Sequence, residues 1–517
     1  MCCWCPWAAL VAYHQVTRLL VLIYYALYYY FARNNKYWKK RNVVGPEPVA
    51  FFGNLKETTL RQKNMSVAMH EIYDMYPNEK VVGIYRMTTP CLLIRDLDLV
   101  KQIMIKDFDQ FMDRGVEFSK SGLGQNLFHA DGDTWSALRT RFTPIYTSGN
   151  LKNMFPLLDE RANLFLNHLE SACKTQTEFQ IHSLVQKYTI STIFACAFGI
   201  DVNYYNRELD DTLKTVDKLS LTPNYALELD MMYQGILKKL NMSVIPNSVT
   251  RFFDSLTNDI ITQRDGKPTN RGDFMDLILQ LREIRELSGS KNRQGNEQKV
   301  LEITEDIIAA QAFVFYVGGY ETSATTMALL FHSLAMNPDV QEKLIQEIDE
   351  VTEAHGGVLT YDCLKEMKYL DKTFRETLRM YPIVDPLQRK AVADYKVPGM
   401  DLVIKKDQVI IVSARGIQHD AKYYPNPEVF DPSRFDAEVE GARHSCAYLP
   451  FGIGPRNCIG MRFGQLQSRL CVATLLSKFR VEPCESTERE ITIDPNRLVN
   501  GPKYGIYLKI VPRNYSL

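Results

Sequence analysis

The segment Phe451-Gly452-Ile453-Gly454-Pro455-Arg456-Asn457-Cys458-Ile459-Gly460 is the most informative stretch of this chain. It places a cysteine in a loop rich in glycine and proline, directly before an apolar pattern with helical spacing. A thiol just before a helix meets free backbone N–H groups and the positive end of the helix dipole, and both favour the thiolate. Glycines also let this backbone approach a flat ligand closely.

This environment is what the axial thiolate of a haem needs, namely an electron-rich sulfur supported by N–H donors. Arg456 adds a cation suited to a carboxylate. The plainer alternative, a buried apolar cysteine, is preferred for most of the 11 cysteines, which apart from Cys2 and Cys5 form no CxxC pair and fit neither a disulfide framework nor a zinc ribbon. For Cys458 it is rejected, because the spacing Phe-x-x-Gly-x-Arg-x-Cys-x-Gly arises by chance in only on the order of one in ten thousand such chains.

The loop resembles the haem-binding signature of cytochrome P450 enzymes, and further motifs follow in family order from about Gly45 to the carboxyl end. Segments such as Val82-Gly83-Ile84-Tyr85-Arg86 resemble insect microsomal members, closest to the detoxifying type of moths and butterflies. The resemblance implies one large, mainly α-helical domain with minor β sheets that encloses a single haem b. It makes Cys458 the axial ligand of the iron and assigns cofactor contacts to Phe451, Gly452, Arg456 and Gly460.

A second motif, Glu376-Thr377-Leu378-Arg379, puts two opposite charges on one face of a helix. Alone, such a pair is ordinary on solvated helices. Here the stretch 427–435 follows, and in the family its arginine, Arg434, joins the pair. We expect Glu376, Arg379 and Arg434 to form a buried network behind the thiolate loop. Its role would be structural, because removing one member strands a buried charge.

Trp135 and Arg139 are separated by one helical turn, so their side chains point the same way. In the family, such a pair lies against the haem propionates. Arg389 and Arg456 match further propionate contacts of the family. Guanidinium groups suit this role because they bind carboxylates through two parallel hydrogen bonds. Without the resemblance, Arg389 would be interpreted as a surface arginine.

The apolar stretch from Glu305 to Met336 lacks proline and predicts a central buried helix of roughly 48 Å. Within it, Gly318-Gly319-Tyr320-Glu321-Thr322-Ser323 weakens the helix locally and leaves room for a ligand. On its own this could be a packing notch. The resemblance implies instead an oxygen-activation site, in which Thr322 holds dioxygen and a water while Glu321 helps to relay protons.

The amino end carries an uninterrupted apolar run from Leu19 to Ala32, followed by basic residues between Arg33 and Arg41. The run reaches only about 21 Å, so a membrane span of about 30 Å would recruit the residues before it. We expect a signal anchor at residues 1–33, a basic, proline-containing hinge at 34–53 and the catalytic domain at 54–517. With the resemblance, the charge order predicts the endoplasmic reticulum membrane with the catalytic domain on its cytoplasmic face. A cleaved signal peptide is the alternative, but its features are not clear.

Other local patterns complete the expected fold. Residues 81–85 and 91–94 predict a β-hairpin, and residues 504–511 predict a further strand. Asn337 and Pro338 predict a helix start with a side-chain cap. Residues 288–298 predict an exposed loop. The 61 basic and 61 acidic residues give no net charge, which argues against a nucleic-acid partner.

The predicted function is insertion of one oxygen atom of O₂ into lipophilic small molecules such as plant toxins or insecticides. The resemblance implies electrons from NADPH through cytochrome P450 reductase, which we expect to dock near Arg141 and Arg462, and cytochrome b5 as a further partner. Lining residues of the substrate pocket are expected to include Phe118, Phe313 and Val499. A haem-thiolate hydroperoxide isomerase is a weaker alternative, because such relatives usually lose the acid–threonine pair, and a haem-binding sensor without activity remains open.

Two residues depart from the family pattern beside this predicted pocket. Asp385 and Gln388 stand where such relatives are usually more apolar or carry a second proline. Because that segment borders the pocket in the family, the pair leaves the polarity of the substrate open.

Overall fold

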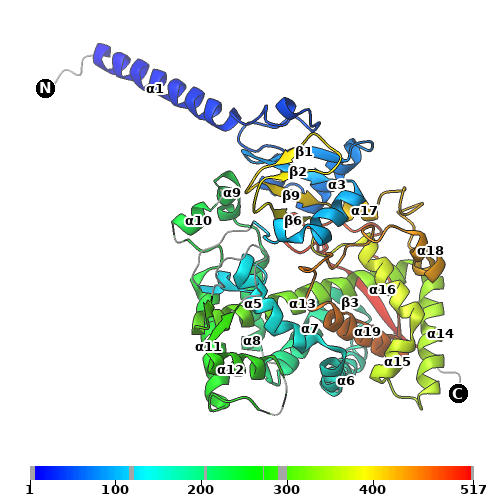
Figure 1. Ribbon diagram of the computed structural model, residues 1–517. Coiled ribbons are helices and arrows are strands. Elements are labelled where there is room, and N and C mark those ends of the chain that lie inside the picture. The colour runs from blue at the N-terminus through cyan, green and yellow to red at the C-terminus, as the bar shows by residue number, and fades with distance from the viewer. Residues whose placement is uncertain are drawn as a thin grey trace.

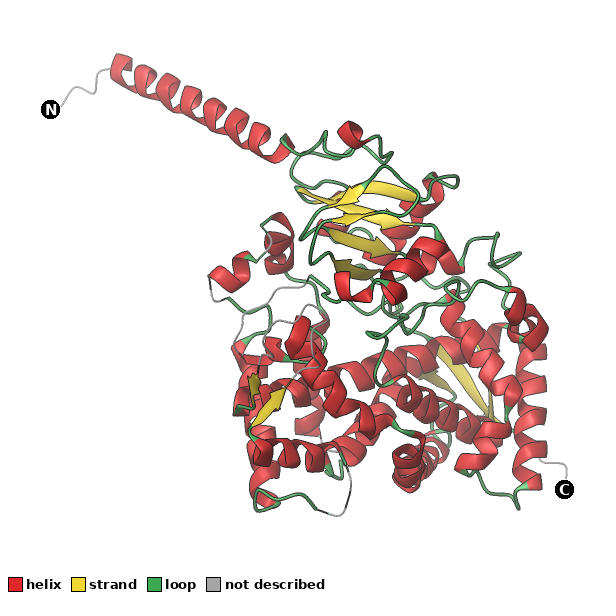
Figure 2. Ribbon diagram, in the orientation of Figure 1, coloured by secondary structure: helices red, strands yellow, loops and turns green. Residues whose placement is uncertain are grey.

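The computed structural model describes residues 6–115, 122–202, 207–233, 235–240, 242–269, 271, 273–288 and 300–513. The predicted fold class is confirmed, because helices dominate and the strands form small sheets (Figure 2). The first helix, α1 (Pro6–Ala32), projects away from the body beside the sheet that contains β1 (Figure 1). Across the described residues, no helix combines the length and hydropathy of a membrane span.

The central helix is α13 (Glu305–Met336), and its bounds agree with the prediction. It begins after Thr304, whose side chain accepts a hydrogen bond from the backbone of Ile307, and it is buried along most of its length. The next helix, α14 (Pro338–Ala354), begins at proline as predicted. The predicted side-chain cap is wrong, because Asn337 instead donates to the carbonyl of Ser333 at 2.7 Å.

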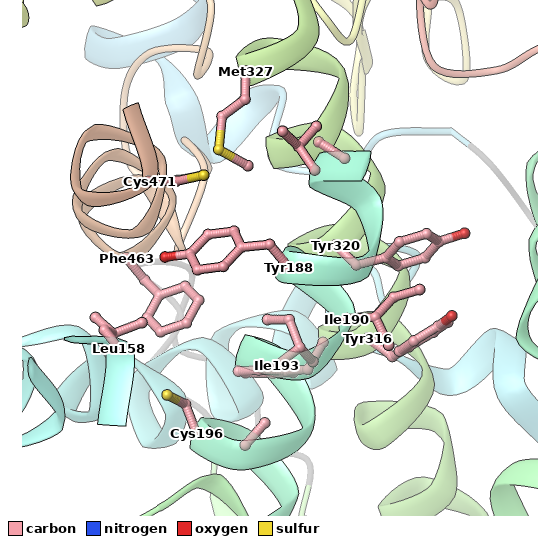
Figure 3. Packing of buried hydrophobic residues seen from close by; sticks show 14 of the residues in the cluster. Leu158, Tyr188, Ile190, Ile193, Cys196, Tyr316, Tyr320, Met327, Phe463 and Cys471 are labelled. Carbon is pink, nitrogen blue, oxygen red and sulfur yellow. The ribbon is translucent and has the colours of Figure 1, made fainter. Parts of the chain in front are cut away.

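A close contact joins α13 to α7 (Ile181–Ile193). A Cβ at Gly319 would lie 2.4 Å from Cδ1 of Ile193, so only glycine permits this approach. Figure 3 shows the same core, where Tyr188 and Ile193 of α7 lie among side chains of α6 (Ser148–Ala172), α13 and α19 (Met461–Lys478). The close approach brings the start of α7 within reach of polar side chains on α13.

The larger sheet has the order β1 (Val81–Arg86), β2 (Thr89–Ile94), β9 (Val409–Val412) and β6 (Leu387–Lys390). The predicted hairpin is confirmed, with Val81 opposite Ile94 and Arg86 opposite Thr89. Trp38, from the segment predicted as a hinge, is buried against this sheet and donates through Nε1 to the carbonyl of Ile84 at 2.9 Å. Part of residues 34–53 therefore packs on the sheet.

A second sheet pairs the last strand with distant parts of the chain. Its order is β10 (Phe479–Pro483), β11 (Tyr507–Pro512) and β3 (Glu178–Gln180), so the predicted strand exists but begins three residues later. Ile181 at the start of α7 donates to the carbonyl of Ile506 at 2.8 Å. Two small pairs are β4 (Glu286–Ser288) with β5 (Val300–Glu302), and β7 (Tyr395–Lys396) with β8 (Val403–Ile404). Residues 289–298 of the predicted loop lie outside the described residues.

The remaining elements surround this frame. The other helices are α2 (Lys56–Thr59), α3 (Met65–Met75), α4 (Leu97–Lys101), α5 (Gly132–Phe142), α8 (Arg207–Leu221), α9 (Tyr225–Met232), α10 (Ile236–Lys239), α11 (Asn247–Gln263), α12 (Phe274–Ile284), α15 (Tyr361–Glu366), α16 (Lys368–Met380), α17 (Ala414–Gln418) and α18 (Ala437–Ala442). Short 3₁₀ or π segments are η1 (Lys39–Arg41), η2 (Gln102–Lys106), η3 (Phe108–Gln110), η4 (Gly122–Gln125), η5 (Thr143–Tyr146), η6 (Phe194–Phe198) and η7 (Pro432–Phe435).

Candidate active site

The thiol loop before α19 has a fixed backbone. The N–H of Cys458 donates to the carbonyl of Phe451 at 2.8 Å, and the N–H of Asn457 donates to that of Gly454 at 3.1 Å. Gly454 has a φ of +78°, and a Cβ there would lie 2.0 Å from the carbonyl oxygen of Met104. Only glycine fits this position, so the loop is held against η2, the segment that contains Met104.

Cys458 is the one exposed cysteine among those that the structure describes. Although its side chain is exposed, protein surrounds it closely enough that burial raises the pKa of the thiol. The backbone of Gly460 and the Arg139 guanidinium favour the thiolate but do not outweigh burial. The backbone N–H of Gly460 thus favours the thiolate as the sequence indicates, and coordination to a metal ion would further favour loss of the proton.

Behind this loop, the structure brings Glu376, Arg379 and Arg434 together. Arg379 donates to Glu376 through Nε at 2.8 Å and through Nη2 at 2.9 Å, and both side chains are fully buried. Arg434 Nε lies 3.3 Å from Oε1 of Glu376. Further bonds run from Arg379 to the carbonyls of Gln418 and Pro427, at 2.9 and 2.7 Å. Burial raises the pKa of Glu376, although both arginines oppose the shift.

The tryptophan–arginine pair on α5 also faces the thiol loop. Both Nη groups of Arg139 donate to Asn457, one to its carbonyl and one to Oδ1, each at 2.8 Å. The guanidinium of Arg456 lies 5.1 Å from the ring of the buried Trp135. Arg456 also donates to the carbonyls of Met112 and Ala130. Arg139 thus holds the thiol loop in place through two hydrogen bonds to Asn457.

Arg389 and Arg456 form a buried cluster with Arg114, which sequence reasoning missed. Burial, and then the neighbouring Arg456, lower the pKa of Arg389 to about 9. Burial lowers the pKa of Arg456 to about 10, and the pKa of Arg114 falls well below its ordinary value for the same reason, with both other arginines adding to the shift. Nothing in the local sequence around Arg114 marks it as part of this cluster.

This cluster fits a ligand that carries carboxylates. The Nε atoms of Arg389 and Arg456 are buried and have no hydrogen-bond partner within the described part of the chain. One nearby carboxylate is that of Asp131, whose Oδ1 lies 3.8 Å from Nη1 of Arg456. Buried like charges without sufficient counter-charge are costly, so an anionic group beside them is favoured.

On α13, one stripe stays open where the rest of the helix is buried. Gly318 is exposed, and Val314 and Thr322, each one turn away from it, are half-buried. Thr322 donates to the carbonyl of Gly318 at 2.7 Å, and a Cβ at Gly318 would meet no atom within 4 Å. The predicted notch therefore provides open space beside a threonine hydroxyl.

The thiol helix contacts α13 beside this stripe. Gln467 of α19 donates to the carbonyl of Gly319 at 3.1 Å and to Oγ of Ser323 at 2.6 Å. A Cβ at Gly464, in the first turn of α19, would lie 3.7 Å from the same Oγ. The fold therefore fixes the start of α19 next to the oxygen-site motif.

Glu321 does not share the open stripe of α13, because its carboxylate contacts α7 and the carboxyl-terminal segment. Its carboxylate accepts a hydrogen bond from Arg497 at 2.8 Å and from Gln186 at 3.0 Å, and Nε2 of His182 lies 3.3 Å away. Burial acts to raise the pKa of Glu321, but His182 and Arg497 outweigh it and the pKa is lowered. None of these three partners was identified from the sequence, because they lie far from Glu321 along the chain.

Among the predicted pocket residues, Phe313 and Val499 are buried, and the ring of Phe313 lies 5.3 Å from that of Phe253. Phe118 lies outside the described residues.

The structure gives Asp385 and Gln388 roles other than lining a pocket. Asp385 accepts hydrogen bonds from Ser66 and from the backbone of Ala414, each at 2.6 Å, and burial raises its pKa to about 6. Gln388 bonds to Arg86 and to the carbonyl of Arg114, each at 2.8 Å. Both side chains are therefore occupied by polar partners from other segments of the chain.

Comparison with known proteins agrees with this geometry. The family model described as Cytochrome P450 matches residues 43–509. Cytochrome P450 6B2 of Helicoverpa armigera is 62% identical over 477 residues, which cover 92% of this chain and 94% of that protein. Cytochrome P450 6B1 of Papilio polyxenes is 54% identical, over 92% and 95% of the two chains. Cytochrome P450 6a2 of Drosophila melanogaster is 38% identical, over 95% and 98%.

The chain belongs to the cytochrome P450 family, and the predicted resemblance to members from moths and butterflies is confirmed. It is a haem-thiolate monooxygenase whose cofactor is haem b. The residues present fit this group, because Cys458 offers an exposed sulfur and the arginine cluster suits its two propionates. When bound, the haem supplies the activation of dioxygen, and the protein positions groups around it.

Proposed function

We propose that this monooxygenase oxidises lipophilic small molecules of foreign origin, such as plant toxins and insecticides. The single observation that best supports this reaction is the open stripe of α13. There Gly318 and Thr322 lie beside α19, the helix that follows the exposed Cys458. The buried apolar side chains of Phe313 and Val499 favour a lipophilic substrate. The resemblance to the detoxifying members of moths and butterflies supports foreign molecules as the class.

Thr322 and Glu321 have the complementary properties that proton delivery needs. The hydroxyl of Thr322 is half-buried on the open stripe and donates within its own helix, so it can exchange that bond for a ligand or a water. Glu321 is the adjacent acid, held in a polar cluster. We propose that Thr322 holds a water in place and that Glu321 carries the proton to it.

We propose NADPH–cytochrome P450 reductase as the electron donor, with cytochrome b5 as a further partner. Arg141 and Arg462 are exposed, and Arg462 borders a groove that is also lined by Lys365 and Arg469. Basic side chains near the thiol helix suit an acidic redox protein. We further propose that α1, whose residues 13–29 are exposed, together with the residues before it, anchors the protein to the endoplasmic reticulum, with the catalytic domain in the cytoplasm.

The first experiment is a ferrous–CO difference spectrum of the purified protein. Wild type should show the red-shifted Soret band of thiolate ligation, and Cys458→Ser should lose it. Cys484→Ser, which changes a half-buried cysteine outside the loop, is the matched control and should keep the band. A wild type that binds haem without this band, after denatured protein has been excluded, would contradict the assignment of Cys458.

The second experiment adds reductase and NADPH and tests a panel of lipophilic substrates. Thr322→Ala should uncouple NADPH consumption from product and release peroxide, with product per NADPH falling on the order of tenfold. Thr326→Ala is the matched control, because Thr326 makes the same type of bond one turn later, to the carbonyl of Thr322 at 2.7 Å. Equal coupling in both variants would overturn the role of Thr322, and absence of reductase-dependent turnover would favour a binding protein.

A further inference from the structure

Glu321 lies in a cluster that joins three helices and the carboxyl-terminal segment. Its partners are Arg497 at 2.8 Å, Gln186 at 3.0 Å and His182 at 3.3 Å. The hydroxyl of Thr325 lies 3.4 Å from Nε2 of His182 and 3.5 Å from Oε1 of Glu321. The carboxylate therefore has a titratable neighbour on α7, the helix that Gly319 allows to approach.

Arg497 is shared between this carboxylate and α8. It donates two hydrogen bonds to Asp217, at 2.6 and 3.0 Å, and Asp217 also accepts from the hydroxyl of Tyr320. One guanidinium thus faces two carboxylates. The cluster lacks one positive charge when His182 is neutral, and a proton on His182 balances it.

The charged groups that face His182 are Glu321, Arg497 and Asp217. Burial acts to lower the pKa of His182, but the Glu321 carboxylate outweighs burial, so the pKa is raised above its ordinary value. The proton of this cluster accordingly rests on the imidazole, and Glu321 stays ionised.

Exposure combined with the ability to titrate distinguishes His182 from the other members of the cluster. Its side chain is 18% exposed, whereas that of Glu321 is 3% exposed. Gln186 cannot carry a proton. Arg497 is also partly exposed, but Asp217 and Glu321 outweigh burial and raise its pKa, so it does not release one. His182 is therefore the member of the cluster that can both meet water and exchange protons at neutral pH.

We propose that His182 delivers protons from solvent to Glu321, while Arg497 and Asp217 hold that carboxylate in place. This inference rests on the proposed role of Glu321 and Thr322. His182 acts through Glu321, so it is a relay and positioning residue away from the reacting atoms.

The proton balance of the relay is simple. The proton on Nε2 of His182 passes to Oε1 of Glu321, which leaves a neutral imidazole and a neutral carboxylic acid. The neutral acid loses its charge attraction to Arg497, which keeps both bonds to Asp217. The freed side chain turns toward Thr322 and gives up its proton to the water that Thr322 is proposed to hold. Glu321 then returns to Arg497 as a carboxylate, and His182 takes a new proton from water.

The test uses the full-length haem protein with reductase, NADPH and a lipophilic aryl ether, 7-ethoxycoumarin, as the probe. His182→Gln keeps a side chain that can donate to Glu321 but cannot titrate. His355→Gln is the matched control, since His355 is also half-buried and lies 3.5 Å from a carboxylate, that of Glu366. Glu321→Gln and Thr322→Ala are measured in parallel, and His182→Asn serves as a second variant if His182→Gln does not fold.

We expect His182→Gln to lower the rate of product formation on the order of 100-fold and to raise peroxide release. Wild-type activity should fall as pH rises through the raised pKa of His182, and this part of the pH profile should vanish in the variant. His355→Gln should behave as wild type.

A second readout needs no turnover. Because the folded-state pKa of His182 is raised, its contribution to stability is complete below the ordinary histidine pKa and is lost as pH rises through the folded value. The thermal midpoint of wild type relative to His182→Gln should therefore decline across that range.

The outcomes separate the two proposals. Wild-type rate, coupling and pH dependence in His182→Gln, beside uncoupling in Glu321→Gln, would overturn the relay through His182 alone. Wild-type coupling in both Glu321→Gln and Thr322→Ala would overturn the proposed role of that pair and the relay with it. Loss of the pH-dependent part of both profiles in His182→Gln alone supports the relay.

Discussion

Two clusters of carboxylates and arginines adjoin this active site, and they differ in exposure. Behind the thiol loop, Glu376 and Arg379 are fully buried and Arg434 nearly so. Beside α13, the side chain of Glu321 is 3% exposed and that of Arg497 is 19% exposed. The first cluster is closed, whereas the second reaches solvent through Arg497 and His182.

The difference shows that similar residues can serve structure in one place and chemistry in another. Glu376 receives hydrogen bonds from Arg379 and from the backbone of Asp431 and lies 3.3 Å from Arg434, so arginines and backbone hold this carboxylate in place. Glu321 has a histidine neighbour, His182, whose pKa that carboxylate raises above its ordinary value. A closed cluster fixes the fold, and an open cluster with a titratable member can exchange protons.

The largest effect should come from breaking the closed cluster with Glu376→Gln. Arg379 and Arg434 would then be buried cations without a counter-charge, so we expect a loss of about 3–5 kcal/mol and little folded haem protein. Glu440→Gln is the control, because Glu440 pairs with Arg375 at the surface and should cost at most about 1 kcal/mol. Thermal midpoints and folded yields measured together would check this, and similar losses in both variants would contradict it.

Breaking the open cluster with Arg497→Gln should cost less, about 2 kcal/mol, because water can reach Asp217 and Arg497. A double-mutant cycle with Asp217→Asn should give a coupling of about 1–2 kcal/mol. The measurement is the thermal midpoint of the four proteins. Strict additivity of the two single changes would show that this pair is not coupled, and the contrast with Glu376 would then need another cause.

The smallest effects should come from the two glycines of α13. Gly319→Ala forces Ile193 away and should cost about 1–2 kcal/mol, because the added Cβ would overlap its Cδ1. The Cβ added by Gly318→Ala would meet no atom within 4 Å, so this change should stabilise the helix by up to about 1 kcal/mol. Thermal midpoints of both variants test this. Since Gly319 sets the approach of α7, its change should also weaken the contact between His182 and Glu321 and leave the closed cluster intact.

Sequence alone predicted the parts that rest on short-range spacing. The loop around Cys458, the pair Glu376 and Arg379, the first hairpin and the bounds of α13 all follow from patterns within one helix, turn or strand pair. Such patterns are visible because the backbone fixes which side chains meet.

Long-range contacts could not be predicted in this way. Arg497 meets Asp217 and Glu321 across 280 and 176 positions of sequence, and Arg114 joins Arg456 across 342. Asp385 was expected to face the pocket, but Ser66 and Ala414 occupy its carboxylate. Which partner a buried charge finds depends on tertiary packing, which no local pattern records.

The late position of Arg497 in the chain also bears on the order in which the protein is made. A ribosome completes α8 and α13 long before it reaches Arg497 and β11. Until then, Asp217 and Glu321 have no guanidinium between them, and burying two carboxylates without one is unfavourable. Closure of α8 and α13 on this cluster is therefore most favourable once the last segment has left the ribosome.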